Sequence, residues 1–249
     1  MFLTSCVHAL ASLTAADEAA MFALYDRYYG VADRAVFVRD LRTKTHAVIL
    51  RDGHGHLLGF STLRVFDHDG ARVIYSGDTI IERAYWGRND FAQVWLRLAG
   101  HIRAEAPDAP LYWLLIVKGS RTYRYLGLFA SSYFPHHERE TPDEVQALID
   151  DIATRHFGAF YDASSGRVFF PEPRSYLKEA LEAPAARDLA RKEVRFFLER
   201  NPGYARGDEL VCLCDLSSPN LTRLSRVWFD EGMKDGVAIA GEEPRRAVV

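Results

Sequence analysis

A strand pattern, a helix pattern and a second strand pattern follow one another between residues 72 and 117. Residues 72–81 are mostly apolar and β-branched, and residues 91–104 carry apolar side chains on one helical face. Residues 111–117 are apolar throughout, as is typical of a strand buried on both sides. This order predicts two parallel strands joined by a right-handed helical crossover, with the loop 82–90 at the carboxyl end of the first strand.

An antiparallel meander is predicted to come before this crossover. Apolar residues with helical spacing predict a first helix over 15–29, where Thr14 and Asp17 have the spacing of an N-terminal capping pair. Strands are then predicted at 47–51 and 57–66, and Gly-rich turns join them to each other and to the strand 72–81.

The second half of the chain has a more helical pattern. Thr141, Pro142 and Glu144 are typical of a helix start, with Thr as the N-cap and Pro at the first helical position. Further helices are predicted at 175–182 and 185–200. A strand is predicted at 209–216, and the tail from Gly232 is expected to be loose.

Composition is that of a soluble globular protein. The 249 residues are 48% hydrophobic and 26% charged, with a net charge of -3, so no basic excess favours nucleic acid as a partner. No apolar run reaches the ~18 to 20 residues of a membrane-spanning helix. The N-terminus lacks the positive start of a secretory signal, and the three cysteines Cys6, Cys212 and Cys214 cannot all pair within the chain. We therefore expect a reduced, cytoplasmic protein.

Two residues interrupt the strand 72–81 in a way that a functional site would explain. Gly77 and Asp78 are both poor strand formers. A β-bulge at this pair would re-aim the Asp78 carboxylate, and partial burial would raise its pKa toward a range useful for a general base. The alternative is that Asp78 only forms a hydrogen bond with a neighbouring loop. Glu82, near the strand end, is the weaker candidate base.

The order of elements and two stretches of sequence resemble the GNAT superfamily of N-acetyltransferases. The run VIYSGDTIIERAYWGRNDFAQVWLRLAG resembles that family's fourth strand, acyl-donor loop and third helix, and LYWLLIVKGSRTYRYLGLF resembles its fifth strand and fourth helix. The resemblance covers roughly residues 15 to 135. It implies a mixed α/β fold with a GNAT-like core over 1–140 and a mainly helical extension over 141–249, which has one strand near 209–216.

The same resemblance implies a thioester acyl donor between the two parallel strands, with acyl-CoA as co-substrate and no metal. Its pyrophosphate would lie on backbone amides at a helix start, where unpaired N–H groups and the helix dipole attract anions. The donor-binding residues implied are Thr79, Ile80, Ile81, Trp86, Gly87, Arg88, Asn89, Asp90 and Phe91.

The donor loop departs from the family pattern. That pattern reads Gln/Arg-x-x-Gly-x-Gly/Ala, whereas this chain has Trp86 to Phe91 with one matching glycine, Gly87. Asp90 would repel phosphates, and Arg88 could compensate for it. An acyl group on an acyl carrier protein is therefore the alternative donor, as in the long-chain N-acyl amino acid synthases that resemble this fold.

The resemblance also implies a tyrosine that protonates the departing thiolate. Counting along the chain places Leu128 or Phe129 at that position, so the usual acid is absent. Tyr123 and Tyr125 lie one to two turns earlier on the predicted helix, and each is a candidate for a catalytic or binding hydroxyl.

Three other features of the sequence were compared with nucleotide-binding or metal-binding motifs. Lys118-Gly119-Ser120 matches only the end of a nucleotide-binding P-loop, because the preceding glycines are absent. His136-His137-Glu138 has no HExxH spacing, so a loop that contacts substrate is favoured over a zinc site. Cys212 and Cys214 alternate on one strand face, which is more typical of buried thiols than of metal ligands.

Two functions remain open from the sequence. The first is an N-acyltransferase that moves an acyl group from a thioester to a primary amine of a small molecule or peptide, with the extension 141–249 on the acceptor side. The second is a non-catalytic module that keeps this fold to sense a ligand or bind a protein. A homodimer is also left open.

Overall fold

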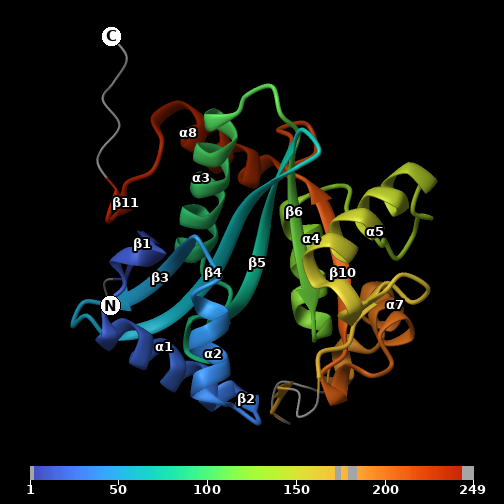
Figure 1. The fold of residues 1–249 in the computed structure, drawn as a ribbon, viewed down its shortest axis with the longest axis horizontal. Helices are drawn as coiled ribbons and strands as arrows, with labels where there is room; N and C mark the ends of the chain where they lie inside the picture. Colours follow the sequence, from blue (N-terminus) through green and yellow to red (C-terminus); the bar gives the residue numbers. More distant parts are fainter. Residues whose placement is uncertain (1–2, 172–174, 179–183, 243–249) are drawn as a thin grey trace. The chain divides into compact units, whose positions relative to one another are not determined.

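The computed structural model describes residues 3–171, 175–178 and 184–242 (Figure 1). The chain divides into two compact units. Unit 1 comprises Met1–Arg27, Asp33–Pro110 and Arg223–Val249, and unit 2 comprises Tyr28–Ala32 and Leu111–Thr222. The mixed α/β fold class is confirmed. The main changes between the units fall at residues 110–111 and 222–223. The expected division into a core over 1–140 and an extension over 141–249 stays a prediction.

Unit 1 is built on an antiparallel sheet. The predicted meander is present as β3 (His46–Asp52), β4 (Leu57–His68) and β5 (Ala71–Ile81). The N-terminal strand β1 (Leu3–Ala9), which the sequence patterns did not predict, pairs antiparallel with β3. The two-residue β11 (Ile239–Ala240) pairs parallel with β1 and so brings the end of the described chain to the sheet edge.

The described residues of this unit form four α-helices, α1, α2, α3 and α8, which are labelled in Figure 1. The predicted first helix is α1 (Ala15–Tyr28), and the Thr14–Asp17 capping pair is confirmed by reciprocal hydrogen bonds. The short helix α2 (Arg34–Leu41) is capped by Asp33, whose carboxylate accepts from two backbone N–H groups. Packing around the meander is completed by α3 (Asp90–Glu105), at the predicted place, and α8 (Arg223–Asp235).

The helices and the sheet of unit 1 share one apolar core. Aromatic rings from α1 and α2 meet the sheet, since Phe37 contacts Tyr25 and Phe60 at centroid distances of 5.1 and 6.2 Å. The helix α3 packs on β1 and β3 and along α8. Fully buried side chains include Met21, Leu24, Ile49, Leu63, Ile74, Leu96, Leu98, Ile102 and Phe229.

Unit 2 also contains paired strands. The predicted strand β6 (Leu111–Val117) pairs antiparallel with β10 (Glu209–Asp215), which continues to the two-residue strands β8 (Arg167–Val168) and β7 (Tyr161–Asp162). Its α-helices in the described residues are α4 (Ser120–Phe129), α5 (Asp143–Phe157) and α7 (Lys192–Arg200). A separate two-stranded pairing joins β2 (Tyr29–Gly30) to β9 (Tyr176–Leu177). The predicted parallel pairing of 72–81 with 111–117 would join a strand of unit 1 to a strand of unit 2, and it stays a prediction.

Three sequence predictions need correction. The helix expected at 175–182 is wrong at Tyr176–Leu177, which form β9, and residues 179–183 lie outside the described chain. The helix expected over 185–200 is only a 3-10 turn (Ala186–Asp188) followed by α7, because the Arg191 backbone is extended. The N-cap of α5 is Pro142 rather than Thr141.

The C-terminal tail is also more ordered than expected. The helix α8 runs through Gly232 to Asp235 and is followed by β11. The remaining residues 243–249 lie outside the described chain. The expectation of a loose tail from Gly232 is therefore wrong over the described residues up to 242.

The cysteines agree with the sequence analysis. Cys6, Cys212 and Cys214 are free thiols, and the last two are buried on β10 as predicted. Burial raises the pKa of both buried thiols, so they stay protonated and unreactive. None of the helices in the described residues is long and apolar enough to cross a membrane.

Candidate active site

The strand β5 contains a bulge where the sequence predicted one. Ser61 pairs with Thr79 and Leu63 pairs with Ser76, so Thr62 alone stands opposite both Gly77 and Asp78. Two residues opposite one is the definition of a β-bulge, which bends the strand and re-aims its side chains. Asp78 is half-buried at this point.

Two side chains lie so close to residue 77 that only glycine fits there. A Cβ atom added to Gly77 would lie 2.5 Å from Thr62 Oγ1 and 2.6 Å from Lys44 Cε. Lys44 is only 6% exposed, and its ammonium group is 2.7 Å from Asp40 Oδ1 and 5.2 Å from the centre of the Tyr75 ring. The bulge is therefore packed against a buried, ion-paired lysine that no sequence pattern indicated.

Replacing Gly77 with Ala is expected to lower the free energy of unfolding by about 1 to 3 kcal/mol, because the new methyl group overlaps Thr62 and Lys44. The Thr62 hydroxyl has no hydrogen-bond partner in the described chain, so Thr62→Ala removes the overlap with Thr62, and leaves that with Lys44, without breaking a bond. Urea unfolding of both single variants and the double variant measures the coupling. Simple additivity of the two losses would show that the overlap does not exist.

The loop after β5 is held by its own aromatic residue. Trp86 donates its indole N–H to the Ile81 carbonyl at 2.7 Å, and the Arg83 guanidinium lies 5.7 Å from the Trp86 ring centre. The 3-10 turn Arg83–Tyr85 lies between Ile81 and Trp86 along the chain. Gly87 has a φ of +81°, a left-handed conformation that favours glycine. Trp86 and Gly87 thus shape the loop directly.

Glu82, the weaker candidate base from the sequence, has a cation beside it. Its carboxylate forms an ion pair with Arg27, and its backbone N–H donates to the Leu58 carbonyl. An adjacent cation makes a carboxylate a weaker proton acceptor. The role of either carboxylate as a base stays a prediction.

The start of α3 carries both charges that the sequence analysis singled out. Arg88 Nε donates to Asp90 Oδ2 at 2.9 Å, and this hydrogen bond lowers the pKa of the Asp90 carboxyl. Asn89 is the N-cap residue but makes no side-chain capping bond, and Phe91 is buried. The arginine thus offsets the carboxylate at the helix N-terminus, where an anionic ligand would otherwise meet repulsion.

The strand segment beyond the bulge has one exposed polar side chain. Thr79 is exposed, and its hydroxyl is 2.7 Å from that of Ser61 on β4. Ile80 is buried, and the Ile81 carbonyl is occupied by the Trp86 indole. Among these three residues, Thr79 offers the polar contact and the two isoleucines shape the strand end.

The two candidate tyrosines lie on α4 in unit 2. Tyr123 is fully buried, donates to the Pro135 carbonyl at 2.9 Å, and has a pKa raised by burial. This placement favours a structural role. Tyr125 is half-buried and stacks on Phe129 with ring centres 6.4 Å apart. That either tyrosine acts in the same reaction as Asp78 of unit 1 stays a prediction.

Comparison with known proteins gives structural similarity only. No protein-family model matches this sequence, and no curated protein matches it. Among solved structures, it is similar to a GNAT family N-acetyltransferase (YhbS) from Escherichia coli in complex with CoA, at 16% identity and a TM-score of 0.38 over 52% of this chain and 70% of that chain. It is also similar to an acyl-CoA N-acyltransferase from Pseudomonas aeruginosa, at 22% identity and a TM-score of 0.39 over 53% and 91%. Similarity at this level does not assign an activity.

A polar cluster in unit 2 was missed by sequence reasoning. Lys118 Nζ lies 3.2 Å from Glu209 Oε1, donates to Ser175 Oγ at 3.0 Å and is 5.3 Å from the centre of the Tyr29 ring. The sequence singled out Lys118 only for its weak likeness to a P-loop. Its partners are too far away along the chain for any spacing rule to connect them.

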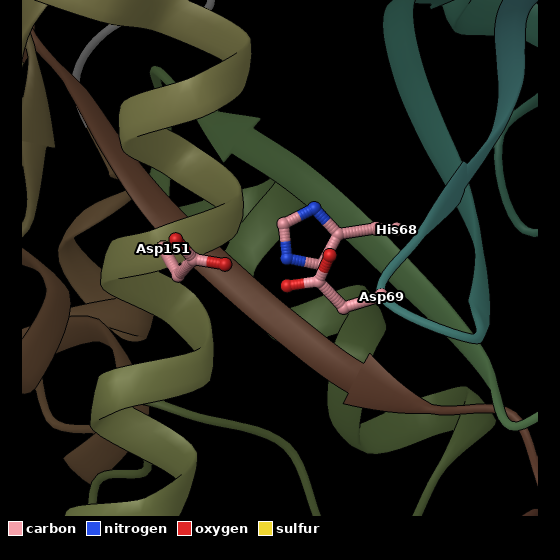
Figure 2. Close-up of side chains that lie close together, drawn as sticks. All are labelled: His68, Asp69 and Asp151. Atoms are coloured by element: carbon pink, nitrogen blue, oxygen red, sulfur yellow. The ribbon is translucent and has the colours of Figure 1, made fainter.

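Possible metal ligands occur in both units. Figure 2 shows His68 and Asp69 at the turn between β4 and β5, and Asp151 on α5. The first two residues belong to unit 1 and Asp151 belongs to unit 2. The expectation that the chain uses no metal stays a prediction.

Proposed function

We propose that this protein is an N-acyltransferase that moves an acyl group from a thioester to a primary amine, with Asp78 as general base. The observation that carries the proposal is the β5 bulge, where Gly77 packs against Thr62 and Lys44 and sets Asp78 outside the regular pairing. Bulges are over-represented next to active sites, where they re-aim a side chain, and this supports a functional role for the half-buried Asp78 carboxylate.

The reaction needs one proton acceptor and one proton donor. The acceptor amine enters as an ammonium ion, and Asp78 would take its proton so that the nitrogen lone pair can attack the thioester carbonyl. A carbon–nitrogen bond forms, the carbon–sulfur bond of the tetrahedral intermediate breaks, and the thiolate leaves with the electron pair. The nitrogen gives up its second proton in this step, and that proton restores the group that protonates the thiolate. The thiolate then takes a proton. Tyr125 is the better candidate donor, because the Tyr123 hydroxyl already donates to Pro135.

The donor is proposed to lie along β5 and the loop up to α3. Acyl-CoA is the first candidate, since the Arg88–Asp90 pair removes part of the repulsion at the α3 N-terminus. An acyl group on a carrier protein is the alternative, because a loop with Gly87 as its one family glycine gives phosphates less backbone to approach. The acceptor is proposed to be the amine of a small molecule or peptide, in the cytoplasm.

A second candidate function is a binding module without catalysis. The observation that favours it is the full burial of Tyr123, which removes one of the two hydroxyls available as proton donors on α4. A module of this kind would bind a thioester or a protein without turnover.

Thioester donors are expected to raise the melting temperature. A ligand at one hundred times its Kd stabilises the native state by about 2.7 kcal/mol, which corresponds to ~5 to 10 °C for a chain of this size. Thermal unfolding with CoA, acetyl-CoA, a long-chain acyl-CoA and an acylated carrier protein tests this, with adenosine 3′,5′-bisphosphate as a control for the nucleotide alone. No shift with any thioester, together with no product from a panel of amines, would rule out the proposed function.

A further inference from the structure

Unit 2 contains a hollow of about 520 Å³ that the proposed acyl transfer does not use. Its lining comes from three parts of the chain: the loop between α4 and α5, the first turns of α5, and the end of α7. The residues that line it include His136, His137, Arg139, Gln146, Phe196 and Arg200. The volume lies within the range of about 300 to 1,000 Å³ that is typical of sites for small molecules.

Buried aromatic residues fix the loop that forms one wall. Tyr123 donates to the Pro135 carbonyl at 2.9 Å, and the Tyr133 hydroxyl is 3.3 Å from His137 Nδ1. The His136 ring lies 4.7 Å from Tyr133 and 4.4 Å from His137, centre to centre. The loop is therefore preorganised by contacts with the core.

The histidine beside these rings is a neutral hydrogen-bond donor. His136 Nδ1 accepts the backbone N–H of Glu138 at 3.0 Å, so its ring proton is on Nε2. Burial, together with Arg139 and His137, lowers the pKa of His136 to about 4, and the ring is uncharged at neutral pH. It can thus offer an N–H group to a ligand without adding charge.

The charges of the lining favour a ligand with one negative charge. Glu138 is ion-paired with Lys192 at 2.8 Å, which leaves Arg139 and Arg200 against one further carboxylate, Glu140. Arg139 uses one nitrogen for the Ser131 carbonyl, and the Arg200 guanidinium group forms no hydrogen bond or ion pair with another described residue. The excess is one positive charge, and the planar guanidinium group matches a carboxylate in geometry.

We propose that this hollow binds a small molecule with a single carboxylate, held by Arg139 and Arg200. The side chain of Phe196 provides an apolar wall for the rest of the ligand. Gln146 donates its amide N–H to Asp150, so its amide oxygen remains as an acceptor for a ligand hydroxyl or amine. A doubly charged phosphate fits less well, because it exceeds the available positive charge and faces Glu140. This site does not depend on the acyl transfer proposed above.

Isothermal titration calorimetry at constant ionic strength tests the assignment on the whole chain. The probe is 4-hydroxybenzoate, which combines one carboxylate with an aromatic ring and a hydroxyl group. Its neutral isostere 4-hydroxybenzamide and inorganic phosphate are the comparison ligands. We expect 4-hydroxybenzoate to bind more tightly than both. Equal binding of the amide, tighter binding of phosphate, or no binding of the probe would each overturn the proposal.

Two variants locate the binding. Arg139→Gln and Arg200→Gln are each expected to weaken binding of 4-hydroxybenzoate about tenfold, the effect of losing a charge-assisted hydrogen bond. Arg195→Gln, on the same helix as Arg200 but outside the lining, is the control and should leave the Kd unchanged. Melting temperatures show that each variant is folded. An unchanged Kd in Arg200→Gln, or an equal loss in Arg195→Gln, would place the anion elsewhere.

Discussion

Replacing Asp78 with Asn is expected to lower kcat for acyl transfer by about 10²- to 10⁴-fold, the usual contribution of a general base. The amide has nearly the shape of the carboxylate but cannot take a proton from the attacking ammonium group. The bulge that positions residue 78 depends on Gly77, Thr62 and Lys44, none of which is changed. The Kd of the thioester donor should therefore stay near that of the wild type. Steady-state kinetics and calorimetry on the same preparations measure the two effects separately.

Two further variants are compared with Asp78→Asn. Asp67→Asn removes a carboxylate that is ion-paired with Arg72 on the same sheet, and it should leave kcat unchanged. Glu82→Gln should have a smaller effect than Asp78→Asn, because the Glu82 carboxylate is already paired with Arg27. Full activity in Asp78→Asn would remove Asp78 from the mechanism. A loss of donor binding together with kcat would indicate a structural role instead.

The local features of the site could be predicted from the sequence because they depend on neighbouring residues. Hydrophobic periodicity gave β5, α3 and β6 nearly to the residue. Gly77 and Asp78 stood out because both are poor strand formers, and the register shift confirms the bulge at that pair. The Arg88–Asp90 pair is also local, since the two residues are close in sequence and share the start of one helix.

The partners of the site residues could not be predicted in the same way. Thr62 and Lys44 contact Gly77 only because the meander and α2 bring them there. The Lys118–Glu209 pair depends on β6 and β10 being adjacent strands. No spacing rule connects residues so far apart, and a single sequence offers no other signal for them.

One error of sequence reasoning has a clear physical cause. The sequence predicts a loose tail from Gly232, and glycine is a poor helix former. In the structure it lies inside α8, where a Cβ atom would be 2.0 Å from the Arg97 carbonyl oxygen on α3. Gly100 on α3 has the reciprocal contact, 2.0 Å from the Phe229 carbonyl oxygen. The two glycines let the helix backbones approach closely, and this packing outweighs the low helix propensity.

Replacing Gly100 with Ala is therefore expected to lower the free energy of unfolding by about 3 kcal/mol, at the upper end of the cost of overpacking. The atoms that a new methyl group would meet belong to the backbone of α8, so no change of side-chain rotamer can relieve the overlap. The two helices would have to move apart and lose buried apolar contacts along their length. Urea unfolding of the wild type and the variant measures the difference.

Gly127→Ala is the matched control with the opposite expected sign. Gly127 also lies inside a helix, α4, but a Cβ atom there would be 3.5 Å from the nearest atom, an ordinary contact. Without overlap, the better helix propensity of Ala should stabilise the protein by about 0.5 to 1 kcal/mol. Gly100→Ala combined with Gly232→Ala should cost less than the sum of the two single losses, because helices already separated by one methyl group accommodate the second. Equal effects at Gly100 and Gly127 would contradict the close crossing of α3 and α8.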